Sequence, residues 1–477
     1  MTTGIVYMPV GLAVLAAQAR EAGHEVCCID AVGRAPASVA LVGKFLRRGL
    51  SSEDCVARIP DDSDAIAVYA LNLLNHEATC AVVRSVRKRF PDKPCAVIEN
   101  NQAVTSYALH EVADSLYAAG ADSILTGESD RTLSLWLERT TFSQHGSFTG
   151  ALNPLVDSFP NALPEMEKIP LPAWDLFPLK NYWKLGHAHG PFSTRSYLPI
   201  QTSRGCPYHC RFCVTPALTH GRWRPRPAEA VVEEMLWAQK KFGVREFHWE
   251  DMNPTIDDKR TRAICEGLLR SRASLVWKIV SGTKVESLRD EETIQLMARS
   301  GCKYLSISPE TGSPDVLRLM GKPFDLDHAV RIAHASAKAG IFLQCCFVLG
   351  FPGETKEDLL LTKELIERLT ALGVDEIALF IMTPAPGSKE YKEPFSTVSL
   401  SELNFSPTWR EDYHELSFFR GELYKHFVIQ KTLGYPLKVT RQAWNFIFRR
   451  FETKMEMAPW RALCHRALIF RARPGNL

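Results

Sequence analysis

The stretch RGCPYHCRFCVTP, residues 204–216, places Cys206, Cys210 and Cys213 within eight residues. A structural zinc site normally closes a tetrahedron with four protein ligands. No fourth cysteine follows at a matching spacing, and His209 lies too close to both neighbours to bind beside them. Three ligands with one open position are typical of a catalytic centre, and thiolates are the usual ligands of iron–sulfur clusters. The stretch therefore predicts an iron–sulfur site that leaves one iron for a substrate or cofactor.

The chain around this trio alternates short apolar strands with helical stretches. Each strand is followed by a helix or loop, which predicts an α/β fold with parallel strands. The strands are expected at about 198–203, 245–250, 276–281, 304–308, 342–349 and 375–382. Together they predict an incomplete (β/α)6 barrel over residues 196–395. Parallel βα folds carry their sites at the carboxyl ends of the strands, and the trio follows the first strand.

Residues 1–145 show the same alternation and predict a doubly wound, Rossmann-like α/β domain. We expect a helix at 11–23 followed by a strand at HEVCCID, residues 24–30. Further strands are expected at 64–71, 94–100 and 122–127, and helices at about 76–90, 105–119 and 130–140.

Residues 146–195 are dense in proline, which breaks helices and strands. We expect an ordered linker, because its Trp174, Phe177 and Tyr182 need an apolar surface to pack against.

Composition limits the classes of function. A length of 477 residues predicts two or three domains, and 45% hydrophobic residues with 23% charged residues are ordinary for a folded globular chain. The net charge of +3 gives no support for a nucleic-acid partner. Apolar runs are shorter than the roughly 18 residues that span a membrane, and no basic residue precedes the first one as in a signal peptide. Most other cysteines, including Cys302, Cys345 and Cys346, lie in apolar runs, so we expect buried thiols and a reducing cytoplasm.

The CxxxCxxC spacing, with Phe212 directly before the last cysteine, resembles the motif of radical S-adenosylmethionine (SAM) enzymes. The resemblance implies that Cys206, Cys210 and Cys213 hold a 4Fe–4S cluster whose open iron chelates the methionine part of SAM. An electron from the cluster then cleaves SAM to a 5′-deoxyadenosyl radical, and Phe212 lies near the adenine. It also implies an external electron donor of the flavodoxin or ferredoxin type.

Motifs after the later strands resemble the SAM-binding segments of the same family. FHWEDMNPT carries an acidic pair suited to the cofactor's ammonium group, although such a pair also serves as a helix cap or turn. LSISPETGSPDVL resembles the ribose-contacting turn, where Thr311 departs from the more usual ESGS, and FVLGFPGETKEDL resembles the adenine-binding segment. The residues implied are Glu250, Asp251, Glu310, Gly350, Gly353 and Glu354.

The order of domains resembles the cobalamin-binding branch of the family, which includes C-methyltransferases and the anaerobic porphyrin-ring cyclase. This likeness covers about residues 8–395 and implies methyl transfer from methylcobalamin to an unactivated carbon. The chain lacks a D-x-H-x-x-G motif, and ENNQAVT replaces the usual glycine-rich turn. His76 is the only imidazole near the first loop, and a solvated side chain is the stronger expectation for it.

Three alternatives stay open. The protein is a non-methylating radical cyclase or rearrangement enzyme, it is a non-catalytic zinc- or corrin-binding protein, or its front domain is a degenerate one kept for substrate binding. The substrate is a small or lipid-like molecule that the sequence does not name.

Residues 396–477 predict a basic, aromatic helical extension. From Arg420 onward the chain has twelve Lys and Arg against three acidic residues. A helix that places aromatic side chains near arginines is suited to peripheral membrane contact or to an acidic, greasy substrate. A helix that covers the open flank of the barrel is the alternative. The residues concerned are Trp444, Phe446, Phe448, Arg449, Arg450 and Phe451.

Overall fold

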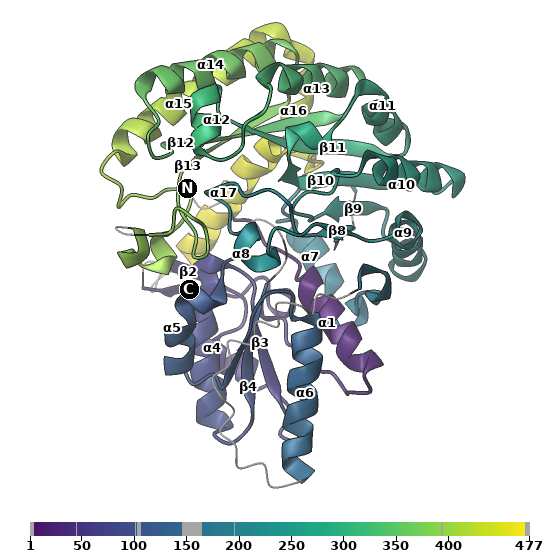
Figure 1. Ribbon diagram of the computed structural model, residues 1–477, viewed down its shortest axis with the longest axis vertical. Coiled ribbons are helices and arrows are strands. Elements are labelled where there is room, and N and C mark those ends of the chain that lie inside the picture. Colours follow the sequence, from purple (N-terminus) through teal and green to yellow (C-terminus); the bar gives the residue numbers. More distant parts are fainter. Residues whose placement is uncertain are drawn as a thin grey trace.

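The computed structural model describes residues 4–43, 45–100, 102, 106–145, 165–194, 196–392 and 395–472. Residues 146–164 of the predicted linker lie outside these ranges. Figure 1 shows two stacked α/β units, with the barrel (residues 196–392) above the front domain (residues 4–145). The tail (residues 395–472) covers one side of the barrel, and its last helix runs between the two units (Figure 1).

The barrel is an open sheet of six parallel strands in the order β13-β12-β11-β10-β9-β6, which confirms the predicted alternation. Its strands are buried on both faces and are rich in Val, Ile, Leu and Cys, as expected of a sheet covered by helices. The strands are β6 (Tyr197–Ile200), β9 (Glu246–Trp249), β10 (Val276–Thr283), β11 (Cys302–Glu310), β12 (Phe342–Leu349) and β13 (Glu376–Ile381). The helices between them are α8 (Thr215–Thr219), α9 (Ala228–Phe242), α10 (Asp258–Arg270), α11 (Glu291–Arg299), α12 (Pro314–Leu319), α13 (Leu326–Lys338) and α14 (Lys356–Ala371).

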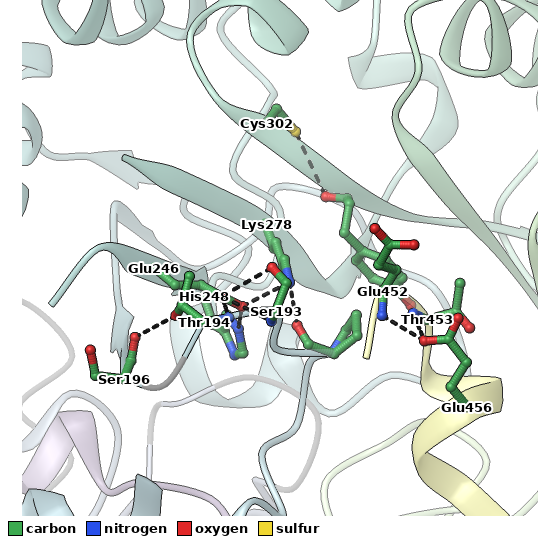
Figure 2. A network of polar contacts seen from close by, with 12 residues as sticks. Ser193, Thr194, Ser196, Glu246, His248, Lys278, Cys302, Glu452, Thr453 and Glu456 are labelled. Atoms are coloured by element: carbon green, nitrogen blue, oxygen red, sulfur yellow. Dashed lines mark hydrogen bonds and ion pairs between the residues drawn. The ribbon is translucent and has the colours of Figure 1, made fainter. Parts of the chain in front are cut away.

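A buried ion pair closes the amino-terminal end of the barrel. Glu246 begins β9, and its carboxylate accepts from Lys278 Nζ on β10 at 2.7 Å and from the backbone N–H groups of Ser193 and Thr194 at 3.0 and 2.9 Å (Figure 2). Burial opposes its ionisation, but Lys278 and a hydrogen bond from His248 hold the pKa of Glu246 well below its usual range. The pair therefore fastens the segment before β6 across the base of the sheet.

The front sheet has three parallel strands in the order β3-β4-β5, namely β3 (Ile66–Ala70), β4 (Cys95–Glu99) and β5 (Ser123–Leu125). Alternate residues of β4 face opposite layers: Cys95 and Val97 pack under α4 (His76–Arg89) and α5 (Ala113–Ala118), while Ala96 and Ile98 pack under α1 (Val10–Glu21) and α6 (Ser129–His145). Helices thus cover both faces, as in doubly wound sheets. The smaller elements here are α2 (Ala31–Arg34), α3 (Ser52–Val56) and the hairpin β1 (Val39–Val42) and β2 (Phe45–Arg48).

The strand expected at residues 24–30 is not formed, so that prediction is wrong. A strand needs a neighbour for its backbone groups, and this segment pairs with none among the described residues. Its alternate residues Cys28 and Asp30 are nevertheless buried, and the Asp30 carboxylate accepts from Tyr182 Oη at 2.8 Å. The apolar pattern of this segment therefore reflects burial against the linker and not pairing in a sheet.

The described part of the linker is ordered and includes α7 (Leu179–Leu185). Trp174, Phe177 and Tyr182 are buried in the core of the barrel, as their size and apolar surface required. Ala13 and Ala17 of α1 join the same core, while Leu15 faces the front sheet. The small side chains of α1 let it lie between the two units.

The tail consists of α15 (Tyr413–Gly434), α16 (Pro436–Phe448) and α17 (Lys454–Ala472). Leu423 and Phe427 of α15 and Met457 of α17 are buried in the barrel core, so the tail does cover the barrel's flank. The predicted aromatic cluster is divided by the fold. Phe451 is buried, whereas Trp444 and Phe448 contact each other through tilted rings and are 63% and 53% exposed.

We predict that Lys278→Met will lower the free energy of unfolding by about 3–5 kcal/mol, because it leaves the Glu246 carboxylate buried without its cation. Thermal and urea unfolding of the purified variant measure this. Lys240→Met, on the exposed side of α9, is the matched control and should change little. Equal effects of the two substitutions would show that the buried pair does not hold the base of the barrel.

Candidate functional site

A cavity of about 1910 Å³ lies where the carboxyl ends of the barrel strands face the front domain. Side chains from both units and from the tail line it, so no single domain encloses it. Its barrel side includes Phe212, Cys213, Ser281, Ser306, Ser308, Glu310, Gln344, Cys346, Val348 and Met382. Its front side includes the loop after β3, from Leu71 to Thr79, and Leu133 and Trp136 of α6.

The cysteine trio lies on a loop after β6 that is closed by a short two-stranded ladder. β7 (Ser203–Arg204) pairs antiparallel with β8 (Arg224–Pro225) and brings the two ends of the loop together. Gly205 has φ +78°, and a Cβ there would overlap the carbonyl oxygen of Arg222, so only glycine fits this close approach. The ladder and this glycine close the loop through contacts of the chain itself, without a bound metal.

Inside the loop the three thiols remain partly exposed and unbridged. The N–H of Cys213 donates to the carbonyl of Cys210 at 3.1 Å, and the N–H of Thr215 donates to Cys213 Sγ at 3.4 Å. Burial raises the pKa of Cys210 to about 12, against an opposing effect of Lys322. A thiol in this setting is deprotonated when a metal ion binds it.

The donor set of the loop suits an iron–sulfur cluster. Its three side chains are free thiols, and thiolates are the usual ligands of such clusters. In a 4Fe–4S cluster each cysteine binds a different iron, so three thiolates leave one iron open. A structural zinc site normally takes four protein ligands instead.

Glu250 and Asp251 follow β9 directly, and the fold gives both of them partners. Glu250 Oε2 accepts from His189 Nδ1 at 2.8 Å and from Ser281 Oγ at 3.1 Å. Burial would raise the pKa of Glu250, but the His189 interaction outweighs it and lowers it. Asp251 Oδ1 accepts from Thr202 Oγ1 and Ser203 Oγ at 2.9 and 2.7 Å, which ties it to the root of the cysteine loop. Only its Oδ2 is buried without a partner in the described chain.

Asn253, which the sequence analysis missed, lies beside the trio. Its Oδ1 accepts from Thr283 Oγ1 and Ser287 Oγ at 2.7 and 3.2 Å, while its buried Nδ2 has no conventional N/O partner in the described structure. A hydrogen bond from this side chain opposes the burial that raises the pKa of Cys206. The signal in the sequence is the position of Asn253, two residues after the acidic pair.

Glu310 ends β11 in a left-handed backbone conformation, φ +67°, which is rare for a residue with a side chain. Lys322 Nζ, also missed by the sequence analysis, donates to Glu310 Oε1 and to the carbonyl of Ser308, both at 2.7 Å. The turn that follows is tight, because a Cβ at Gly312 would overlap the backbone of Leu361. Backbone strain of this kind is concentrated at functional sites.

The end of β12 supplies a glycine turn beside an apolar surface. Gly350 (φ +75°) and Gly353 (φ +89°) both need glycine, and the N–H of Gly350 donates to the carboxylate of Glu354. Burial raises the pKa of Glu354 to about 7, against hydrogen bonds from the backbone. Arg410 of the tail binds the carbonyls of Gly350 and Met382, both at 2.9 Å, and so joins the ends of β12 and β13.

Phe212 packs against a small apolar cluster at this same edge. The cluster consists of Val316, Met320, Val348, Phe351 and Met382. Phe212, Val348 and Met382 line the cavity, so the site has an apolar wall next to the cysteine loop.

On the front side, the expectation for His76 changes. Its ring nitrogens lie 3.0 Å from Tyr107 Oη and 2.7 Å from Ser115 Oγ, and the side chain is buried. Neither nitrogen is free to bind a metal in the cavity, so His76 is an internal packing residue and not a solvated one. The neighbouring loop residues Asn72 and Asn75 do line the cavity.

An ion cluster joins the front domain to the cysteine loop. Arg204 Nη1 lies 2.5 Å from Asp130 Oδ2 and 3.2 Å from Glu128 Oε2, and Arg224 also binds Glu128. Arg204 and both carboxylates are buried. The turn before α6 is thereby held next to the strand that leads into the trio.

Comparison with known proteins agrees with this geometry. Residues 200–366 match the model of the Radical SAM superfamily. This part of the chain belongs to the radical SAM superfamily. Its fold is similar to that of the radical SAM methyltransferase TsrM from Kitasatospora setae, solved with cobalamin and a 4Fe–4S cluster bound, at a TM-score of 0.61 and 17% identity over 80% of this chain and 74% of that one.

Two relatives indicate the range of reactions that similar proteins catalyse. The cytidylyl-2-hydroxyethylphosphonate methyltransferase of Streptomyces wedmorensis is 24% identical over 443 residues, which is 81% of this chain and 77% of the relative. An anaerobic magnesium-protoporphyrin IX monomethyl ester cyclase of Rubrivivax gelatinosus is 25% identical over 347 residues, 68% of this chain and 60% of the relative. The chain thus spans less than two thirds of the cyclase.

Proposed function

We propose that the protein is a cobalamin-dependent radical SAM enzyme that methylates an unactivated carbon of a small molecule. The observation that carries the proposal is the loop of three free thiols, of which Cys213 lines a cavity shared with the strand ends of a second α/β domain. When bound, the cluster supplies the electron that cleaves SAM, and the corrin supplies the methyl group. Residues 1–145 would form the corrin-binding domain and residues 196–395 the radical SAM domain.

The side chains around the trio suit SAM. Cys206, Cys210 and Cys213 would hold the cluster, and Asp251 Oδ2 is a buried acceptor without a partner in the described chain, as an ammonium ligand requires. Glu310, with its strained backbone, would accept from ribose hydroxyls. The apolar wall with Phe212 and the glycine turn at Gly350 to Glu354 would receive the adenine. Glu250 would act through His189, its present partner.

The front domain also suits a corrin. Its cavity-facing loop offers Asn72 and Asn75, while the imidazole of His76 is engaged inside the front domain. Several buried polar atoms of the front domain have no partner in the described structure, two in side chains that follow β4 and β5 and two on α6. They belong to the side chains of Gln102, Thr126, Thr132 and Trp136. A large polar ligand would satisfy such groups, which otherwise cost free energy when buried.

Cyclisation without methyl transfer is the second candidate, favoured by the likeness to the porphyrin-ring cyclase. Both reactions would consume SAM and produce 5′-deoxyadenosine. Only methyl transfer regenerates methylcobalamin from a second SAM and releases S-adenosylhomocysteine. Cleavage of SAM would take one electron from outside the chain in either reaction, and methyl transfer would take a second one to reduce the cobalamin before it accepts a new methyl group. We propose a donor of the flavodoxin or ferredoxin type in the cytoplasm.

The reconstituted protein should bind about four irons and four sulfides per chain and retain hydroxocobalamin after desalting. With dithionite and SAM it should release 5′-deoxyadenosine and S-adenosylhomocysteine together, measured by chromatography and mass spectrometry. Replacing any one trio cysteine with alanine should abolish both products, whereas Cys302→Ala, in the buried core, should not. If the protein releases deoxyadenosine but no S-adenosylhomocysteine, and retains no corrin, the result would favour the cyclase-type candidate instead.

Glu310→Ala and Asp251→Ala should both weaken SAM binding, but they should differ in cluster content. Losing a charge-assisted contact weakens binding by about 10- to 150-fold. Glu310→Ala should keep the cluster, while Asp251→Ala should also lower iron and sulfide content, because Asp251 anchors Ser203 at the root of the loop. Equilibrium dialysis with labelled SAM and iron analysis measure the two effects, with surface Glu291→Ala as the control. Unchanged SAM affinity in both variants would contradict these assignments.

Contact with a membrane surface is a further part of the proposal. No helix in the described ranges is long and apolar enough to cross a bilayer. The outer side of α15 and α16 nevertheless presents large apolar side chains to solvent: Leu433 is 79% exposed, Leu437 83% and Ile447 68%. Arg441, Arg449 and Arg450 in the same part of the chain are exposed as well, which suits an anionic lipid surface.

Sedimentation with phosphatidylglycerol-containing vesicles tests this contact. The wild-type protein should sediment with the vesicles, and Trp444→Ser/Ile447→Ser should remain in the supernatant. Leu360→Ser, at an exposed apolar residue of α14, is the matched control and should bind like the wild type. If the doubly substituted protein still binds the vesicles, this face does not contact the membrane. If the wild type is a dimer that the double substitution dissociates, the face is a protein–protein interface instead.

A further inference from the structure

The inner end of the cavity contains a lysine from the tail. Lys454 begins α17, and its Nζ donates to the carbonyl of Val280 on β10 at 2.8 Å and to Gln344 Oε1 on β12 at 3.2 Å. Lys454, Gln344, Ser281, Ser306 and Cys346 all line the cavity. A side chain more than 240 residues after the cysteine trio thus completes the floor of the same site.

The start of α17 is held firmly against the barrel. Glu456 Oε2 accepts from the N–H groups of Glu452 and Thr453 at 2.6 and 3.2 Å, a contact that Figure 2 shows beside the barrel strands. The N–H of Met455 donates to Glu376 Oε2 on β13 at 2.7 Å. The position of Lys454 between Thr453 and Met455 is therefore set by the fold and not by a flexible end.

The ammonium group of Lys454 has neutral partners only. In the described chain no carboxylate oxygen lies within ion-pair distance of its Nζ, and the two contacts above are to a carbonyl and an amide. The nearby carboxylates are engaged elsewhere, Glu250 with His189 and Glu376 with Tyr304. Burial lowers the pKa of Lys454, although Cys346, Glu376 and Glu250 oppose it. A cation in such a place gains most from an anion that enters the cavity.

The distance between this floor and Glu310 limits the length and shape of a bound molecule. Ser306, Ser308 and Glu310 alternate along β11, and all three face the cavity. Ser306 pairs with Gln344 and Glu310 pairs with Phe347, three residues further along β12, so Ser306 and Gln344 lie roughly 10 Å below Glu310. Ser306 Oγ donates to Gln344 Oε1 at 2.8 Å, which places both polar groups beside Lys454. A molecule held at the floor would extend upward to the level of Glu310.

We propose that Lys454, with Gln344 and Ser306, binds the oxyanion group of the substrate, a carboxylate or a phosphate-type group. The substrate is then a small, elongated anion whose far end points to the cysteine loop. The assignment as substrate rests on the proposed function, whereas the anion site itself does not. Lys454 is on this account a binding residue that sets the position of the reacting carbon.

Calorimetric titration of the reconstituted protein with inorganic phosphate, and separately with acetate, tests the site. Lys454→Met should weaken binding of the preferred anion by about 10- to 150-fold. Lys454→Arg should restore most of the affinity, and Lys425→Met on the exposed side of α15 should bind like the wild type. The stronger of the two anions identifies the headgroup. Equal anion affinity of Lys454→Met and the wild type would overturn the proposal.

Gln344→Leu is the second variant, for the case in which Lys454→Met does not fold. It should weaken anion binding by a smaller factor while iron, sulfide and SAM binding stay at wild-type values. No effect of Gln344→Leu on anion affinity would also count against the site. If the wild type binds the anion through Lys454 but yields no S-adenosylhomocysteine, the proposed methyl transfer fails and the anion site remains.

Discussion

The buried contact between Arg204 and the carboxylates of Glu128 and Asp130 is the interaction on which the site depends. Arg204 lies two residues before Cys206, and its partners lie at the start of α6 in the front domain. Burial works against the charge, but the two carboxylates outweigh it and raise the pKa of Arg204. Because the charges lie in a low-dielectric interior, loss of one partner would leave the other uncompensated. The cysteine loop and the front domain therefore keep a fixed relation to each other.

This fixed relation explains why the cavity has three different walls. The barrel contributes strand ends with the trio, the front domain contributes the loop after β3, and the tail contributes Lys454 and Phe405. The tail also covers the flank at β13, which an incomplete barrel leaves open. A ligand in the cavity would contact all three, so the chemistry of the cysteine loop is combined with substrate contacts drawn from distant parts of the chain.

Most acidic side chains around the site are already engaged. Glu250 is paired with His189, Asp251 with Thr202 and Ser203, and Glu310 with Lys322. Each pair positions a loop as well as offering a remaining oxygen to a ligand. Substitution of such a residue therefore changes the shape of the site and its affinity together, which is why cluster content has to be measured beside cofactor binding.

Short stretches of the sequence were sufficient to predict much of the fold and part of the site. The cysteine spacing, the six barrel strands and the glycines at residues 350 and 353 follow from short stretches whose periodicity or backbone needs are local. The sequence also indicated that Trp174, Phe177 and Tyr182 would be packed. These features depend on neighbours within a few residues, so the order of amino acids is sufficient to predict them.

Only the tertiary structure decided which residues contact one another. The segment at residues 24–30 has the apolar pattern of a strand, yet it packs against Tyr182, because a strand also needs a free sheet edge. His76 reads as a loop residue but is enclosed between Tyr107 and Ser115, which lie more than 30 residues away. Lys322, Asn253 and Lys454 carry no motif, since a single charged or amide side chain gains its role from the groups the fold brings beside it. Burial and charge pairing act through space, and the sequence alone does not contain those distances.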